Sequence, residues 1–91
     1  MILDCEGDVL IVEQHILDLK NQTESIYKRL LQMNRNMIHG AFVLDESGQK
    51  VLFRDTLALE NLDRNEVDST FSALTLALVE HLDEFKTIAK N

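Results

Sequence analysis

The longest regular pattern of hydrophobic positions lies in the last third of the chain, and it predicts one helix from Asp63 to Asn91. Asp63 is a favourable N-cap residue, and Glu66 follows three positions later, as in a capping box. No Gly or Pro interrupts the segment, so the helix is predicted to be continuous. Alternating spacings of four and three place one stripe on a single helical face: Val67, Phe71, Leu74, Leu78, His81, Phe85 and Ile88.

The middle of this helix is more apolar than a single buried stripe requires. Leu76 and Val79 lie on the face opposite the stripe, and a helix that is hydrophobic all round is usually buried on more than one side. Each large apolar side chain left in water forgoes roughly 1.5–3 kcal/mol. The second face is therefore expected to be covered, either by another helix of the same chain or by a second subunit.

The first part of the chain predicts two strands and a helix. Met1–Cys5 is a short candidate strand, Glu6–Asp8 is a turn, and Val9–Leu17 is a second strand rich in β-branched residues. Because the second strand is apolar on both faces in its first half, it is expected inside the sheet or covered on both sides. Asn21–Met37 is the first helix, which Asn21 can cap and His39-Gly40 is expected to close. Its apolar stripe is Ile26, Leu30, Met33 and Met37, widened by Tyr27 and Leu31.

The segment Ala41–Leu59 is the clearest hairpin. Ala41–Asp45 and Lys50–Leu59 are its strands, and the turn Glu46–Gln49 contains Gly48, where φ is expected to be positive. The order is thus strand, strand, helix, strand, strand, helix. Consecutive strands joined by tight turns pair antiparallel, so the predicted class is α+β, an antiparallel sheet of two hairpins with two helices in a single domain over residues 1–91.

Composition and charge narrow the class of protein further. The net charge is −7, and the first nineteen residues carry five acids and no Lys or Arg, which makes a nucleic-acid partner unfavourable. These acids could attract a basic partner segment, or they could simply keep a small protein soluble. No apolar run approaches about 18 residues, so no membrane span is expected. The N-terminus lacks the pattern of a signal peptide, and the single Cys cannot form an internal disulfide, which is consistent with the cytoplasm.

The residues that could carry chemistry form no recognisable constellation. His15, His39 and His81 have no helical i, i+4 partner, and Cys5 has no Cys partner, so neither a metal nor another cofactor is expected. A phosphate loop, a nucleophile elbow and an EF-hand are all missing, and no catalytic residue is assigned. Asp55 is the one unusual placement, because it falls on the apolar side of its strand. It is interpreted as an edge-strand charge or as a tie to a neighbouring backbone group.

Three segments carry a family resemblance. These are His39–Gly48, Val51–Leu57 and Leu59–Asp63, in which a phrase of the kind G-x-F-x-L-D-x-x-G precedes a strand and a long amphipathic helix. The chain resembles the YbjN-like and CesT-type (Tir chaperone) group, which has the type III secretion chaperone-like fold, over roughly residues 9 to 88. The resemblance implies a small acidic α+β protein, usually a homodimer, that binds other polypeptides without enzymatic activity. The full fold commonly starts with a helix and an extra strand, whereas Met1 here opens what looks like a later strand.

The predicted function is accordingly a non-enzymatic protein-binding module, a chaperone-like protein or an adaptor, that forms a homodimer through the helix Asp63–Asn91 or the helix Asn21–Met37. The alternative is a regulatory or structural subunit that associates only with itself and has no client. A small-molecule sensor, which would need a closed apolar pocket, is a third possibility. The candidate interface residues are Met33, Met37, Leu74, Leu76, Leu78, Val79 and Leu82.

Overall fold

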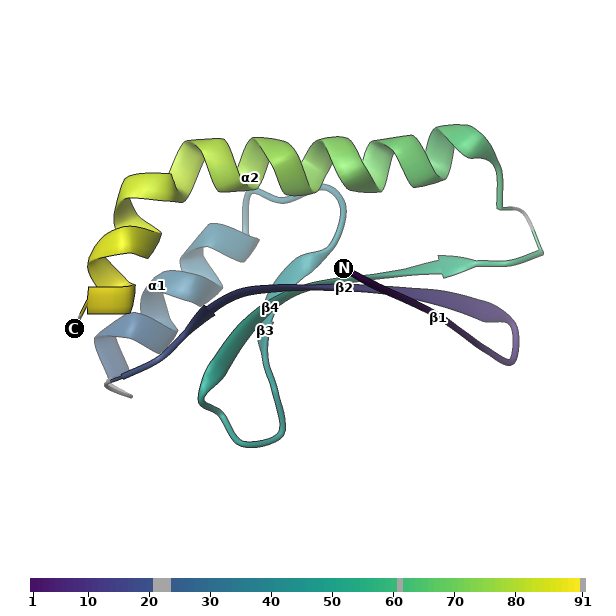
Figure 1. The fold of residues 1–91 in the computed structure, drawn as a ribbon. Coiled ribbons are helices and arrows are strands. Elements are labelled where there is room, and N and C mark those ends of the chain that lie inside the picture. The colour runs from purple at the N-terminus through teal and green to yellow at the C-terminus, as the bar shows by residue number, and fades with distance from the viewer. Residues whose placement is uncertain (21–23, 61, 91) are drawn as a thin grey trace.

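The computed structural model describes residues 1–20, 24–60 and 62–90 as a four-stranded antiparallel sheet with α1 and α2 on one of its faces (Figure 1). The predicted class and element order are confirmed. In chain order the elements are β1 (Ile2–Glu6), β2 (Val9–Asp18), α1 (Glu24–Asn34), β3 (Ala41–Leu44), β4 (Lys50–Ala58) and α2 (Arg64–Lys90).

The strands do not lie in sequence order. The sheet order is β1-β2-β4-β3, so the two hairpins meet through their long strands, β2 and β4, and the short strands β1 and β3 form the two edges. The β2–β4 pairing runs from Val9 opposite Ala58 to Asp18 opposite Lys50, with an irregularity between His15 and Leu17. The expectation that the second strand lies inside the sheet is confirmed.

The two faces of the sheet have different environments. Val12, Val51 and Phe53 are buried beneath the helices, because alternate residues of a strand point to the same face. Residues between them point the other way: Glu13 lies opposite Arg54, and the two side chains form an ion pair at 3.7 Å. One face is therefore the core and the other faces solvent.

The long helix α2 agrees with its prediction, apart from Asn91, which lies outside the described residues. The Asp63 Oδ1 atom accepts a hydrogen bond from the Glu66 backbone N–H at 2.8 Å, so Asp63 is the N-cap. The buried residues are Thr70, Leu74, Ala77, Phe85 and Ile88. The buried stripe is thus centred slightly to one side of the predicted one, and Phe71 lies at its exposed margin.

The first helix is shorter than predicted. Helix α1 ends at Asn34 and not at Met37, and the Asn34 side chain hydrogen-bonds the backbone of Phe42 in β3. The next residues form tighter turns, with the Met37 N–H donating to the Asn34 carbonyl at 3.1 Å. The predicted cap, Asn21, lies outside the described residues.

Gly40 has a different role from the helix stop that the sequence suggested. It follows the end of α1 by several residues and has a positive φ of 73°. A Cβ atom at this position would lie 2.4 Å from the Cζ atom of Phe53. Only glycine therefore lets the chain enter β3 directly over the Phe53 ring.

Candidate protein-interaction site

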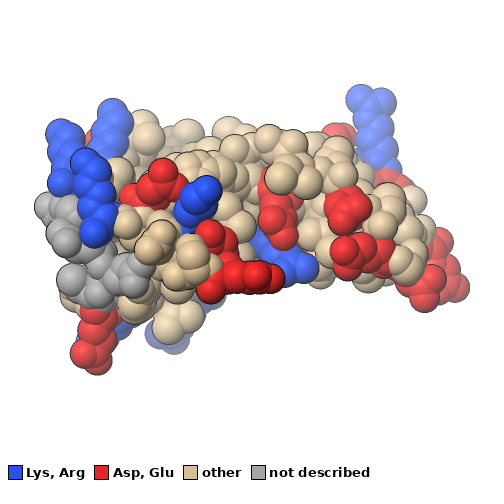
Figure 2. Space-filling view, turned by 60° about the horizontal axis from the view of Figure 1, so that its bottom comes forward, with Lys and Arg blue, Asp and Glu red and all other residues tan. Residues whose placement is uncertain are grey.

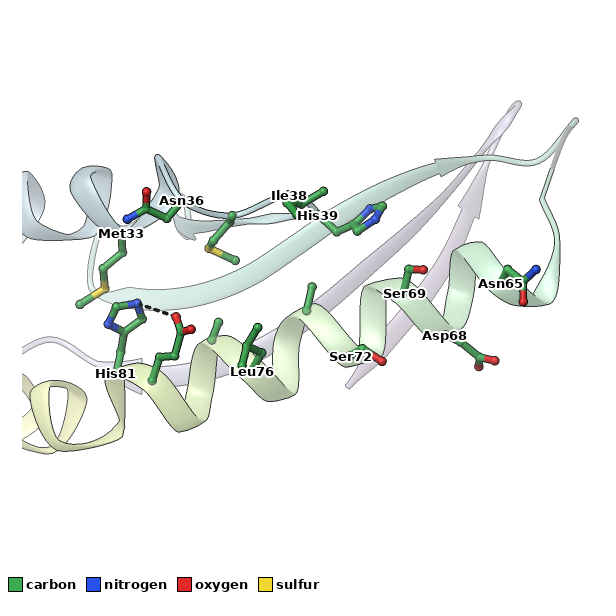
Figure 3. A pocket seen from close by; sticks show the side chains of 14 residues that line it. Met33, Asn36, Ile38, His39, Asn65, Asp68, Ser69, Ser72, Leu76 and His81 are labelled. Carbon is green, nitrogen blue, oxygen red and sulfur yellow. Dashed lines mark ion pairs between the residues drawn. The ribbon is translucent and has the colours of Figure 1, made fainter.

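A groove of about 800 Å³ runs between α2 and the segment that joins α1 to β3 (Figure 3). One wall comes from the end of α1 and the following residues, including Met37, Ile38 and His39. The other wall is a flank of α2 that includes Ala73, Leu76 and Ala77. The small alanine side chains leave room at this flank, and because α1 ends early at Asn34, the irregular segment after it forms the opposite wall.

Two of the polar residues that line the groove are acidic, and one of them, Asp68, forms an ion pair with Arg64 at 3.6 Å. Asp68 and Glu80 are among its fourteen lining residues, and none of the fourteen is Lys or Arg. At one end, the Nε2 atom of His81 lies 3.9 Å from a Glu80 carboxylate oxygen, and the His81 ring packs edge-on against Phe85 with centroids 6.1 Å apart. A side chain that enters the groove would meet apolar carbon on the walls and acceptors or carboxylates at the margins.

The exposed side of α2 continues the apolar surface of the groove. Leu76 is 59% exposed and Val79 is 71% exposed, and Leu82 lies on the same side of the helix. Leu76 lines the groove and also a shallow depression that it shares with Phe71 and Val79. Leu76 therefore connects the groove to the exposed apolar residues of α2.

The structure divides the seven predicted interface residues into three sets. Leu76, Val79 and Leu82 are exposed on α2, and Met37 is half-buried in the groove wall. Leu78 is partly buried against the core. Met33 and Leu74 are 1% and 6% exposed, because α1 and α2 turn these side chains into the core of the chain, and Met33 also lines the groove. Their place at an interface stays a prediction.

Other exposed apolar residues were not among the predicted interface residues. Ile38 is almost fully exposed at the mouth of the groove, and Ile2 and Leu3 are exposed on β1. Ile38 was missed because the predicted helix ended at Met37 and no element was assigned to the residues beyond it. The β1 residues were missed because only the strand order shows that β1 is an edge.

Asp55, the unusual polar placement of the sequence, has a structural role. Its Oδ2 atom accepts a hydrogen bond from the hydroxyl of buried Thr70 at 2.7 Å, and its Oδ1 atom accepts one from the Thr56 N–H at 2.9 Å. The backbone tie that the sequence suggested is present, whereas the edge-strand alternative is wrong because β4 lies inside the sheet. Asp55 therefore joins the start of α2 to β4.

Within residues 1–20, 24–60 and 62–90, no group of three His, Cys, Asp or Glu side chains is placed to hold a metal ion. Among the helices in that part of the chain, none is both long enough and apolar enough to cross a bilayer.

Comparison with known proteins identifies one family. The family model CesT_Tir_1 matches residues 1–91, the whole chain, in agreement with the CesT-type resemblance of the hairpin and helix motifs. No curated protein matches the chain.

Proposed function

The chain belongs to the CesT_Tir_1 family, and we propose that it is a non-enzymatic, chaperone-like protein that binds a polypeptide partner. The observation that carries this proposal is the exposed apolar surface of α2, which extends from the groove through Leu76 to Val79, with Leu82 exposed on the next turn. The family supports a protein-binding role in general, and the surface supplies a place for it on this chain.

The shape of the surface favours a polypeptide over a small molecule. The groove opens along its length and passes into a shallow depression on the same helix, so it encloses a ligand on few sides. Pockets for small molecules bury most of their ligand surface. Apolar side chains of a polypeptide could enter the groove from its open side, next to the exposed face of α2.

We further propose that the protein is a homodimer in which the exposed face of α2 contributes to the interface. Leu76, Val79 and Leu82 are large apolar residues on one helix, and covering each would gain roughly 1.5–3 kcal/mol. The same observation favours a second candidate function, a regulatory or structural subunit that uses this face only for self-association. The two functions differ in whether any surface remains for a client.

The test combines two measurements on the wild type, the double variant Leu76→Asp/Val79→Asp and the control Thr87→Asp. Thr87 is exposed on α2, outside the groove and the shallow depression. Light scattering at micromolar concentration gives the oligomeric state, and affinity capture from lysate of the natural source followed by mass spectrometry identifies partners. Circular dichroism and thermal unfolding establish that each variant is folded.

We expect a dimeric wild type and a partner that the double variant loses and the control retains. A monomeric wild type would refute the homodimer. Recovery of the protein alone, with no other polypeptide enriched, would favour the self-associating subunit. Equal capture by all three proteins would refute the assignment of the partner to this face of α2.

A further inference from the structure

The outer side of α1 carries an exposed apolar residue between two cations. Leu31 is 70% exposed and lines a shallow depression together with Tyr27, Lys28 and Arg35. Lys28 and Arg35 are exposed, and neither forms an ion pair with any other residue that the structure describes. Figure 2 shows several Lys and Arg side chains gathered at the left-hand end of the molecule, the end at which α1 lies in Figure 1. In a protein of net charge −7, these cations are a local exception.

The outer side of α2 carries a charge of the opposite sign beside its apolar residues. Val79 is 71% exposed, and the exposed Asp83 lies one turn further along the same side of the helix. Lys86 is exposed on the following turn. Within the described part of the chain, neither Asp83 nor Lys86 forms an ion pair. One chain therefore presents two uncovered apolar helix sides, with a cation beside Leu31 and a carboxylate beside Val79.

The arrangement of the two helices suits a two-fold pairing of their outer sides. Both helices cover the same face of the sheet, so their outer sides both point away from it (Figure 1). They run in opposite directions: Arg29 of α1 pairs with Glu84 of α2, whereas Met33, one turn later in α1, lines the same groove as His81, which comes earlier in α2 (Figure 3). A two-fold axis roughly along the helices therefore places the α1 of each copy on the α2 of the other and keeps these helices antiparallel.

We propose that a second copy of this chain binds by reciprocal helix pairing, in which the outer side of α1 in each copy covers the outer side of α2 in the other. The helices are antiparallel, Leu31 of one copy lies over Val79 of the other, and Lys28 lies beside Asp83. This inference rests on the proposed homodimer and names the two surfaces that form it. The pairing covers an exposed apolar residue on each helix and gives each of the two unpaired charges an opposite charge.

The same register brings a second pair of opposite charges together. Glu24 lies four residues before Lys28, and Lys86 lies three residues after Asp83, so in an antiparallel pair Glu24 of one copy meets Lys86 of the other. Glu24 is exposed and forms no ion pair within the described residues. Two independent charge pairs therefore favour the same register.

Pairings of like helices suit these surfaces less well. An antiparallel pair of α1 with α1 centred on Leu31 places Lys28 of one copy beside Arg35 of the other, because these residues lie three before and four after Leu31. Like charges at this distance oppose association. A pair of α2 with α2 centred on Val79 avoids that conflict, but it leaves Leu31 in water and Asp83 without a cation.

The reciprocal pairing leaves the groove open for a client. Val79, Asp83 and Lys86 do not line the groove, whose flank on α2 includes Ala73 and Ala77 (Figure 3). Self-association and polypeptide binding would thus use different sides of α2. A self-associating protein of this kind retains a surface for a partner.

The test exchanges charges between the helices and measures the dimer by sedimentation equilibrium. Lys28→Glu and Asp83→Lys each place like charges at both contacts of a dimer formed by one variant alone. We expect each variant to raise the dissociation constant of the dimer on the order of tenfold. An equimolar mixture of the two variants restores an opposite-charge pair at both contacts, because each variant keeps the residue that the other needs. The mixture should therefore form a heterodimer about as tightly as the wild type forms its homodimer.

A second exchange and a matched control keep the test sharp. Glu24→Lys and Lys86→Glu should each weaken the dimer alone and recover it when mixed, which supplies an independent test if a variant of the first pair is not folded. Lys50→Glu and Glu46→Lys are the controls, because they reverse charges of the same signs at exposed positions in the β3–β4 hairpin. The controls should keep the wild-type dissociation constant, alone and mixed. Circular dichroism and thermal unfolding establish that each variant is folded.

Several results would overturn the inference. A wild-type dimer that neither exchange affects would remove the helix pairing and leave the proposed homodimer standing. A loss in Asp83→Lys that mixing with Lys28→Glu does not restore would indicate a pair of α2 with α2, and a tighter dimer of Lys28→Glu would indicate a pair of α1 with α1. A monomeric wild type would overturn this inference together with the homodimer. The polypeptide-binding function would still stand in that case if the affinity capture finds a partner.

Discussion

The side chain of Asn34, the last residue of α1, takes the place of a neighbouring strand at Phe42. It accepts a hydrogen bond from the Phe42 N–H and donates one to the Phe42 carbonyl, the two outward groups of that residue in β3. One amide at the end of α1 thus ties the helix to the sheet and occupies the outward groups of one residue at that edge. At the opposite edge, no side chain of the described residues bonds to the backbone of β1 in this way. The two edges of the sheet therefore differ in how far their backbone groups are already occupied.

Replacing this amide should destabilise the fold. Asn34→Ala leaves the Phe42 N–H and carbonyl without their partner, and we expect a loss of about 1–3 kcal/mol in the free energy of unfolding, measured by urea denaturation. Gln32→Ala, at an exposed position in the same helix, is the control and should change stability by less than about 0.5 kcal/mol. Similar losses in the two variants would show that the amide is not what holds α1 to β3.

The buried hydroxyl of Thr70 should contribute more to stability than an exposed threonine of the same helix. Thr70→Val keeps the shape of the side chain but removes the hydrogen bond to Asp55, leaving one carboxylate oxygen without this donor. We expect a loss of about 1–3 kcal/mol in thermal or urea unfolding. The matched control is Thr75→Val, because the exposed Thr75 hydroxyl bonds only to the Phe71 carbonyl within α2. An equal loss of stability in Thr75→Val would show that the Thr70–Asp55 hydrogen bond contributes no more to stability than a hydrogen bond within the helix.

Two glycines with the same positive φ should respond differently to alanine. Gly40 and Gly48 both have φ of 73°, and a Cβ atom meets Phe53 and the Arg54 carbonyl at Gly40 but open space at Gly48. Gly48→Ala should cost about 1–2 kcal/mol from the left-handed backbone alone. Gly40→Ala should cost about 1–3 kcal/mol more from the steric conflict. Urea unfolding of both variants measures the difference, and equal losses would show that the chain can shift away from Phe53.

Asp45 should make the β3–β4 turn sensitive to acid. Hydrogen bonds from the Ser47 hydroxyl and from backbone N–H groups, including those of Lys50 and Gln49, lower the pKa of the Asp45 carboxyl below its ordinary value of 3.8. The folded state therefore favours the ionised form. Its contribution is present above pH 3.8 and is lost as the pH falls through the lower, folded-state pKa.

The measurement is the melting temperature of the wild type and of Asp45→Asn as a function of pH. The wild type should be the more stable protein near pH 7, and the difference should shrink as the pH falls below 3.8. Glu46→Gln, at an exposed position in the same turn, is the control and should show no such convergence. A difference that stays constant down to the acid limit would show that the charge of Asp45 does not act on this turn.

The sequence predicted the exposure of those candidate residues whose position on a helix depends on spacing alone. Leu76 and Val79 lie opposite the buried stripe of α2, so their exposure followed from a period of 3.6 residues. The burial of Met33 and Leu74 in the core could not be predicted, because a residue on an apolar stripe can face its own core or a partner, and spacing does not distinguish the two. The groove could not be predicted, because its second wall is the irregular segment that begins where Asn34 ends α1.

By itself, the sequence determined the six elements, their order, the antiparallel hairpins and the capping of α2 by Asp63, since each depends on residues close together in the chain. Only the tertiary structure decided that β2 lies beside β4, that β1 and β3 are the edges, and that Asn34 bonds to Phe42 at one of them. These relationships join residues that are distant in sequence. Backbone pairing is nearly the same for every residue type, so the choice among strand orders depends on how the whole apolar surface is buried together.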